Sequence, residues 1–180
     1  AGITDVPRVK SQASETRDKK IIKVAEEGTQ NILDVISDKC KIIFPSTHVV
    51  YEGIDKIKTE IKEDEITKPV LSYSSSKAIN EKQLKDSGKN YVILRLGSVY
   101  GYSTDSMRVD IMPNLFSKIA SQNGTLKLFA SGKQIKSLVP LIDVARCFKF
   151  MEEKEKINSE IFNLTKDTIT VKGVAEICKK

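Results

Sequence analysis

The chain has 180 residues, of which 39% are hydrophobic and 30% are charged, a balance that is typical of a folded domain and excludes an intrinsically disordered chain. Its net charge of +6 comes mainly from lysines scattered among acidic residues, so we expect no nucleic-acid partner. No apolar run approaches the length of a membrane span and no basic-then-apolar leader is present, so we expect neither a membrane segment nor a signal peptide.

Helices and strands alternate along the first half of the chain. Apolar residues recur at three- and four-residue intervals near 16–38, which predicts an amphipathic helix, and residues 40–44 form an apolar run typical of a buried strand. Residues 52–70 are charged and irregular, and we expect a surface excursion there. A second helix is expected at 73–88, ending in a glycine that suits a left-handed cap, and a second buried strand at 91–95.

The second half of the chain continues the alternation. We expect, in order, a loop at 107–113, a helix through Leu115 and Ile119 that Gly124 ends, strands at 126–130 and 135–139, a helix near 141–154, strands at 161–164 and 168–171, and a helix after Lys172. Strands that alternate with helices predict an α/β sheet with crossover helices.

The stretch Ser72–Lys77 places a phenol and an ammonium on one face of the predicted second helix. Tyr73 and Lys77 are four residues apart and are therefore neighbours on a helix. A tyrosine with a pKa of about 10 is a poor base at neutral pH, and a fixed cation close by lowers that pKa. The pair can therefore serve in proton transfer, although the same spacing also fits an ordinary helix start with a solvated lysine.

Two further motifs flank this pair. Residues 44–51 read Phe-Pro-Ser-Thr-His-Val-Val-Tyr, and residues 94–101 read Leu-Arg-Leu-Gly-Ser-Val-Tyr-Gly. A strand ending in hydroxyls, a helix opening with Tyr and Lys, and a strand followed by Arg-x-x-x-Val-Tyr-Gly thus occur in this order. The order resembles the NAD-dependent epimerase/dehydratase family, the extended short-chain dehydrogenase/reductases that include UDP-galactose 4-epimerase-like enzymes.

The resemblance implies an α/β fold with part of a Rossmann-like parallel sheet, crossover helices and part of a small C-terminal substrate-binding region. It assigns residues 1–101 to an NAD(P)-binding domain and residues 102–180 to the substrate-binding region. It also implies a cytoplasmic enzyme that uses NAD or NADP to epimerise or reduce the sugar of a nucleotide sugar. Members of the family commonly dimerise, so we expect a homodimer formed through helices 16–38 and 73–87.

The family's site residues carry over onto matching positions of this sequence. The resemblance implies that Thr47, with Ser46 as the neighbouring candidate, donates a hydrogen bond to the reacting sugar oxygen while Tyr73 shares its proton. Lys77 would support Tyr73 and hold the nicotinamide ribose. The implied catalytic residues are Thr47, Tyr73 and Lys77; the implied cofactor-binding residues are Ala1, Gly2, Pro45, Tyr73 and Lys77; and the implied substrate-binding residues are His48, Ser98 and Lys136.

Several positions depart from the family pattern. Ser98 stands where the family has an asparagine, and Lys136 stands where it has a phosphate-binding arginine, which keeps the charge but loses bidentate geometry. Ala25 replaces an asparagine of the first helix. His48 follows Thr47 where a 4,6-dehydratase has an acid pair, so the sequence favours an epimerase or a reductase over a dehydratase.

Other residues near the motifs have simpler interpretations. We expect Arg95, at the end of a strand, to be an ion-pair partner rather than a catalyst, and we expect Tyr51 and Tyr100 to be packing residues. The single histidine and the three cysteines, with no Cys-x-x-Cys pair, predict no metal site and indicate a reducing compartment.

The sequence contains no G-x-x-G-x-x-G turn, through which a Rossmann domain approaches a pyrophosphate. Either the protein binds no dinucleotide, or the chain is a piece of a longer one; its opening at Ala1 and its end inside a predicted helix favour the piece, which we expect to be inactive without the upstream part. Two alternatives stay open: a non-catalytic relative that senses a cofactor or binds a partner, and a small lysine-rich binding domain that is itself the natural product.

Overall fold

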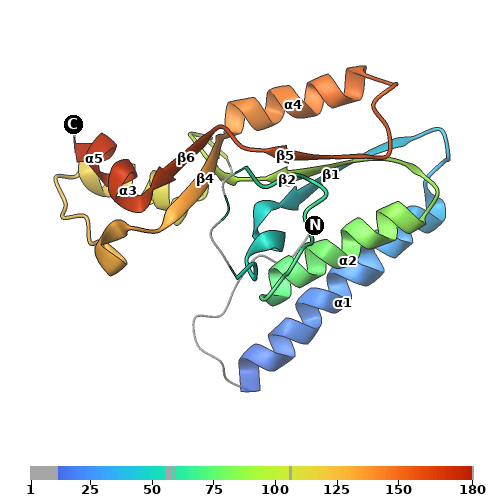
Figure 1. Cartoon of the computed structure of the whole chain (residues 1–180), viewed down its shortest axis with the longest axis horizontal. Helices are drawn as coiled ribbons and strands as arrows, with labels where there is room; N and C mark the ends of the chain where they lie inside the picture. The colour runs from blue at the N-terminus through green and yellow to red at the C-terminus, as the bar shows by residue number, and fades with distance from the viewer. Residues whose placement is uncertain (1–11, 56–57, 59, 106, 180) are drawn as a thin grey trace. The chain divides into compact units, whose positions relative to one another are not determined.

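The computed structural model describes residues 12–55, 58, 60–105 and 107–179 (Figure 1). Contacts divide the chain into two compact units. The first unit holds the described residues up to Arg95 together with Met151–Asn163, and the second holds Leu96–Phe150 and the described residues from Leu164 onward. None of the helices in the described ranges is long and apolar enough to cross a membrane.

The first unit is built on a three-stranded sheet with the strand order β1-β2-β5. Its elements are α1 (Gln12–Val35), β1 (Lys41–Thr47), the 3₁₀ helix η1 (His48–Tyr51), α2 (Ser72–Asp86), β2 (Asn90–Leu96) and most of β5 (Glu160–Leu164). The sheet is parallel and α2 is the crossover between β1 and β2, which confirms the predicted α/β class. Its core contains Leu33, Leu84 and Ile93, from α1, α2 and β2.

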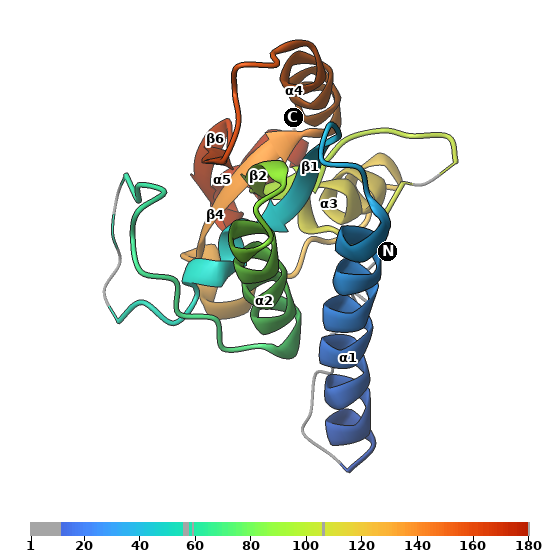
Figure 2. The ribbon, with the colours of Figure 1, turned by 90° about the vertical axis from the view of Figure 1, so that its right-hand side faces the viewer.

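Helices α1 and α2 lie side by side in both views (Figure 1, Figure 2). Asn80 of α2 donates to the Ala25 carbonyl of α1 at 2.8 Å, and this bond joins the two helices at their middles. Ile21 and Leu33 of α1 are buried. The apolar side chains of Val24, Ile32 and Val35 are exposed instead, the last at 83%. In contrast, α2, which is described throughout, exposes no large hydrophobic side chain.

The start of α2 is fixed by a carboxylate from outside the helix. Glu52 Oε1 accepts hydrogen bonds from the backbone amides of Val70 and Leu71, both at 2.7 Å, and from the hydroxyl of Ser74. These amides and the hydroxyl lie at the N-terminal end of the helix, where the helix dipole favours a negative charge. At the other end Gly88 has a φ of +67°, so the predicted left-handed cap is confirmed.

The charged excursion between β1 and α2 is closed at its neck. Gly53 N donates to the Lys68 carbonyl and Lys68 N donates to the Val50 carbonyl, both at 2.8 Å. A Cβ atom at Gly53 would lie 2.6 Å from the Lys68 oxygen, so only glycine permits this approach. The two ends of the excursion therefore meet where it leaves and rejoins the fold.

The second unit contains a mixed three-stranded sheet with the order β3-β4-β6. Its elements are β3 (Ser98–Tyr100), α3 (Met112–Ser121), the 3₁₀ turn η2 (Phe129–Gly132), β4 (Ile135–Pro140), most of α4 (Leu141–Glu153), β6 (Asp167–Thr170) and α5 (Val171–Lys179). Strand β3 runs parallel to β4, with Ser98 opposite Leu138, and β6 runs antiparallel to β4. Phe116, Leu138, Val174 and Ala175 form the core, and Tyr100 packs against it as predicted.

One sequence-based expectation in this unit is wrong. Residues 126–130 were predicted to form a strand, but the chain there leads into η2, where Ala130 and Ser131 have φ values of +47° and +55°. Such left-handed backbone cannot continue a strand. The helix α3 ends at Ser121, and the turn after it is closed by the bond from the Gly124 amide to the Ile119 carbonyl at 2.9 Å.

Candidate functional site

The face of α2 that points to the end of β1 carries three side chains at four-residue spacing. Tyr73, Lys77 and Glu81 lie one helical turn apart in sequence, so they share one side of the helix. Tyr73 and Lys77 are partly buried, and Glu81 is buried with 2% of its surface exposed. The helix therefore presents a phenol, an ammonium and a carboxylate in a row.

Lys77 contacts the end of β1. Its Nζ donates to the Pro45 carbonyl at 2.8 Å and lies 4.7 Å from the centre of the Phe44 ring. Burial lowers the pKa of Lys77 below the ordinary lysine value, and the negative charge of Glu81 partly offsets this. The structure thus brings together Pro45 and Lys77, two of the residues predicted to bind the cofactor.

Thr47 and Ser46 are both buried where β1 ends. The Thr47 hydroxyl accepts a hydrogen bond from the Val49 amide at 3.4 Å and caps η1. The Ser46 hydroxyl donates instead to Glu81 Oε1 at 2.6 Å. Two consecutive residues of β1, Pro45 and Ser46, are therefore bonded to consecutive turns of α2.

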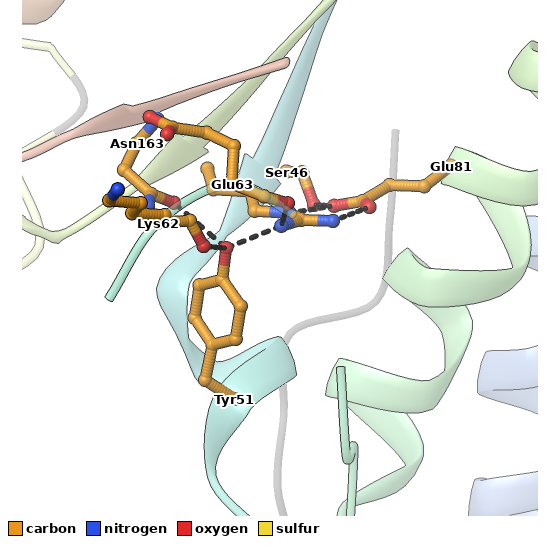
Figure 3. A network of polar contacts seen from close by, with 7 residues as sticks. Ser46, Tyr51, Lys62, Glu63, Glu81 and Asn163 are labelled. Carbon is orange, nitrogen blue, oxygen red and sulfur yellow. Dashed lines mark hydrogen bonds and ion pairs between the residues drawn. The ribbon is translucent and has the colours of Figure 1, made fainter. Parts of the chain in front are cut away.

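Arg95 and Glu81 form a buried ion pair (Figure 3). Arg95 Nε donates to Glu81 Oε1 at 3.0 Å and Nη2 donates to Oε2 at 2.7 Å, which is the bidentate geometry of a strong pair. Burial lowers the pKa of Arg95, but its interactions with Glu81 and Tyr51 together more than offset this, so the pKa is raised overall. The prediction that Arg95 is an ion-pair partner is confirmed.

Tyr51 extends this network beyond the ion pair. Its hydroxyl accepts from Arg95 Nη1 and lies 3.2 Å from Asn163 Oδ1 and 3.3 Å from the Lys62 carbonyl, while its ring lies 5.0 Å from the guanidinium carbon (Figure 3). Burial raises the pKa of this phenol, and Arg95 partly opposes the shift. The expectation that Tyr51 only packs is therefore wrong, because its hydroxyl is a member of a polar network.

The network also holds the excursion that follows η1. Arg95 Nη1 donates to the Glu63 carbonyl at 2.9 Å, and the backbone amide of Asn163 donates to Glu63 Oε1 at 2.8 Å. Asn163 Nδ2 donates to the Ile61 carbonyl at 2.9 Å. Sequence reasoning missed Glu81, Glu63 and Asn163; only Glu81 carried a signal, its spacing of four residues from Lys77.

The other predicted site residues lie at several places. His48 begins η1 and is partly buried. Ser98 and Lys136 belong to the second unit, where Ser98 begins β3 and Lys136, exposed in β4, pairs with Ile169 of β6. Ala1 and Gly2 lie outside the described residues. Within the described ranges, no group of His, Cys, Asp and Glu side chains could hold a metal ion.

Comparisons with known proteins agree with the fold. A family model described as the NAD dependent epimerase/dehydratase family matches residues 9–165. A comparison with curated protein sequences gives no match.

Solved structures with the same fold include sugar-nucleotide epimerases. A UDP-glucose 4-epimerase of Thermotoga maritima, solved with UDP-glucose, has a TM-score of 0.80 at 24% identity, over 95% of this chain and 58% of that chain. A UDP-glucuronic acid 4-epimerase of Bacillus cereus, solved with UDP-glucuronic acid and NAD, has a TM-score of 0.80 at 21% identity, over 99% and 56%. A Thermus thermophilus UDP-glucose 4-epimerase, solved with NAD, has a TM-score of 0.79 at 21% identity, over 99% and 58%. The chain therefore spans a little over half the length of these solved chains.

Proposed function

Because the chain belongs to the NAD-dependent epimerase/dehydratase family, we propose that the full-length protein is an NAD(P)-dependent enzyme that epimerises or reduces the sugar of a nucleotide sugar. Thr47, Tyr73 and Lys77 carry its chemistry. The observation that supports this most is the contact of Lys77 with Pro45, two residues before Thr47, on the helix face that also carries Tyr73. This contact ties the helix of the proposed proton carrier to the strand end of the proposed hydrogen-bond donor.

The donor set of Lys77 and Tyr73 fits a nicotinamide ribose. An ammonium has three N–H donors, so the bond to Pro45 leaves donors of Lys77 that can reach a ribose hydroxyl. The phenol one turn earlier can bond to the ribose as well. A bound NAD(P) would supply hydride transfer at the sugar carbon.

The chain's own residues handle the proton. The positive charge of Lys77 favours the phenolate of Tyr73, which takes the proton of the reacting sugar hydroxyl. The Thr47 hydroxyl donates a hydrogen bond to the oxygen on which negative charge develops. For a reductase the same groups act in reverse, with Tyr73 giving a proton to the new hydroxyl.

The remaining parts of the proposal concern binding and assembly. Ala1, Gly2 and Pro45 line the cofactor, and His48, Ser98 and Lys136 contact the substrate. A homodimer formed through residues 16–38 and 73–87 is supported by the exposed apolar side chains of α1, whereas α2 adds none. We place the protein in the cytoplasm and expect these 180 residues to be inactive without an upstream part that completes the cofactor site.

The test is the Tyr73→Phe variant of the full-length protein. We expect kcat to fall by about 100- to 10,000-fold, the range of a lost general acid–base group, with NAD(H) still bound as measured by absorbance. Tyr102→Phe is the matched control, because Tyr102 is 79% exposed, and it should keep wild-type turnover. Turnover of Tyr73→Phe at the wild-type rate would overturn the proposed mechanism. Bound NAD(H) in the wild type without turnover of any nucleotide sugar in a panel would favour a non-catalytic relative.

A further inference from the structure

The buried ion pair of Glu81 and Arg95 in the first unit contacts the helix and the strand end that carry the proposed catalytic residues. Glu81 follows Lys77 by one helical turn, and its Oε1 accepts from Ser46, the residue before Thr47. The same carboxylate accepts two hydrogen bonds from Arg95. One carboxylate therefore links the helix of Tyr73 and Lys77, the strand end of Thr47, and the neighbouring strand β2.

A buried ion pair joins a helix to a sheet at a high cost in desolvation free energy. Removing two charges from water costs several kcal/mol per ion before their attraction is counted, and apolar side chains of similar volume often serve stability as well or better. Here each nitrogen of the Arg95 guanidinium and each oxygen of the Glu81 carboxylate has a hydrogen-bond partner, and no buried side-chain nitrogen or oxygen of the described residues lacks one. A network satisfied to this degree fixes the relative position of its members.

We propose that Glu81 and Arg95 are positioning residues, which hold the end of β1 against α2 so that Thr47 stays at the working distance from Tyr73 and Lys77. This inference rests on the proposed function. The position depends on two bonds at consecutive turns, Lys77 to Pro45 and Ser46 to Glu81, and Arg95 holds Glu81 in the orientation that makes the second one.

The titration of Lys77 is a measurement that would not change if Glu81 and Arg95 only stabilised the fold. From its own helix Lys77 faces the phenol of Tyr73 and the carboxylate of Glu81, and from β1 it faces the Phe44 ring and the Pro45 carbonyl. The guanidinium of Arg95 lies beyond that carboxylate. Removing the charge of Glu81 leaves burial to lower the pKa of Lys77 further, so its proton is lost at a lower pH.

The experiment compares Glu81→Gln with Asp86→Asn in the full-length protein. Both changes remove one negative charge from α2, but Asp86 is exposed and pairs only with the surface residue Lys82 among the contacts described. For Glu81→Gln we expect kcat to fall by about 10- to 100-fold with KM changed less than about threefold, as for a small misplacement of reacting groups. The alkaline limb of the kcat profile should move to lower pH. Asp86→Asn should leave kcat, KM and the profile unchanged.

Two further measurements separate this inference from the proposed function and from a folding defect. The titration of the Lys77 side chain, followed by NMR of ¹³C-labelled lysine, should move to lower pH in Glu81→Gln even if the wild type turns over no nucleotide sugar; an unmoved titration would overturn the role of Glu81. If Glu81→Gln fails to fold, Ser46→Ala removes only the hydrogen bond between Ser46 of β1 and Glu81, and it should still lower kcat about 3- to 10-fold. A folded Glu81→Gln or Ser46→Ala protein with wild-type kcat would overturn the positioning role.

Discussion

The two units of the chain bury very different side chains. Among the described residues, the buried polar and charged ones belong to the first unit, with the single exception of Asn114. They include Ser46, Thr47, Ser74, Ser76, Asn80, Glu81 and Arg95. The second unit instead joins α3, β4 and α5 through apolar contacts, and its described ion pairs lie at the surface.

The first unit buries polar and charged side chains at a cost in stability that the apolar core of the second unit avoids. A buried hydroxyl or charge costs free energy unless it is paired, whereas an apolar core gains free energy from each side chain it buries. The buried charged side chains of the first unit, Glu81 and Arg95, lie at one place, the meeting point of β1, α2 and β2. This is also where the residues with a proposed role in proton transfer lie.

Loss of one partner of the ion pair should give the largest effect on stability. We expect Arg95→Leu to lower the free energy of unfolding by about 3–5 kcal/mol, because it leaves the Glu81 carboxylate buried without its partner. The double variant Arg95→Leu/Glu81→Leu should recover much of that loss. Denaturant unfolding of the wild type, Arg95→Leu, Glu81→Leu and the double variant measures this coupling. A double variant as unstable as the sum of the two single ones would mean that the pair is not coupled, and the contrast between the units would fail.

The second-largest effect on stability should come from a cavity in the core of the second unit. We expect Leu138→Ala to cost about 2–4 kcal/mol, since Leu138 is buried in the core cluster with Phe116 and Val174. Truncating a second side chain of this cluster should not restore the lost stability, whereas removing Glu81 should restore part of what Arg95→Leu loses. The exposed Ile135 of the same strand gives a matched control, and Ile135→Ala should change the unfolding free energy by less than about 1 kcal/mol.

The smallest effect concerns the pH dependence of stability at Lys77. Its pKa is lowered by burial, so between that pKa and the ordinary lysine value the unfolded chain holds a proton that the folded chain has lost. The free energy of unfolding therefore rises with pH across this window. Relative to Lys77→Met, the wild type should gain stability as pH rises toward the ordinary lysine pKa. Denaturant unfolding of both proteins over this range checks it, with Lys85→Met as a control for net charge. A constant difference between wild type and Lys77→Met would contradict the prediction.

Features that depend on local sequence were predicted correctly. The helices around Ile21 and Tyr73, the strand at 91–95 and the cap at Gly88 follow from periodicity and from backbone preference, and the structure contains all of them. The family was also predicted correctly, because its motifs are short stretches that can be read without knowing what they contact.

Features that depend on distant partners were not predictable. The run Leu126–Ala130 alternates like a strand, but the following turn is set by Gly132, where a Cβ atom would lie 2.9 Å from the amide of Lys172. Glu81 and Arg95 are 14 residues apart, and nothing in their spacing shows that both are buried. The roles of Thr47, Tyr73 and Lys77 stay predictions, and so does the division of function between residues 1–101 and 102–180.

The closed neck of the excursion after η1 has a consequence for how this protein can be altered. Its two ends are bonded to each other at Gly53 and Lys68, and Glu52 accepts hydrogen bonds from the amides of Val70 and Leu71, just before α2. Lengthening a loop whose ends are already joined adds little closure entropy. A tag or a reporter peptide inserted at the exposed Ile66, past Lys62 and Glu63, should therefore leave the register of Tyr73 intact, so that this segment offers an attachment point next to the proposed chemistry.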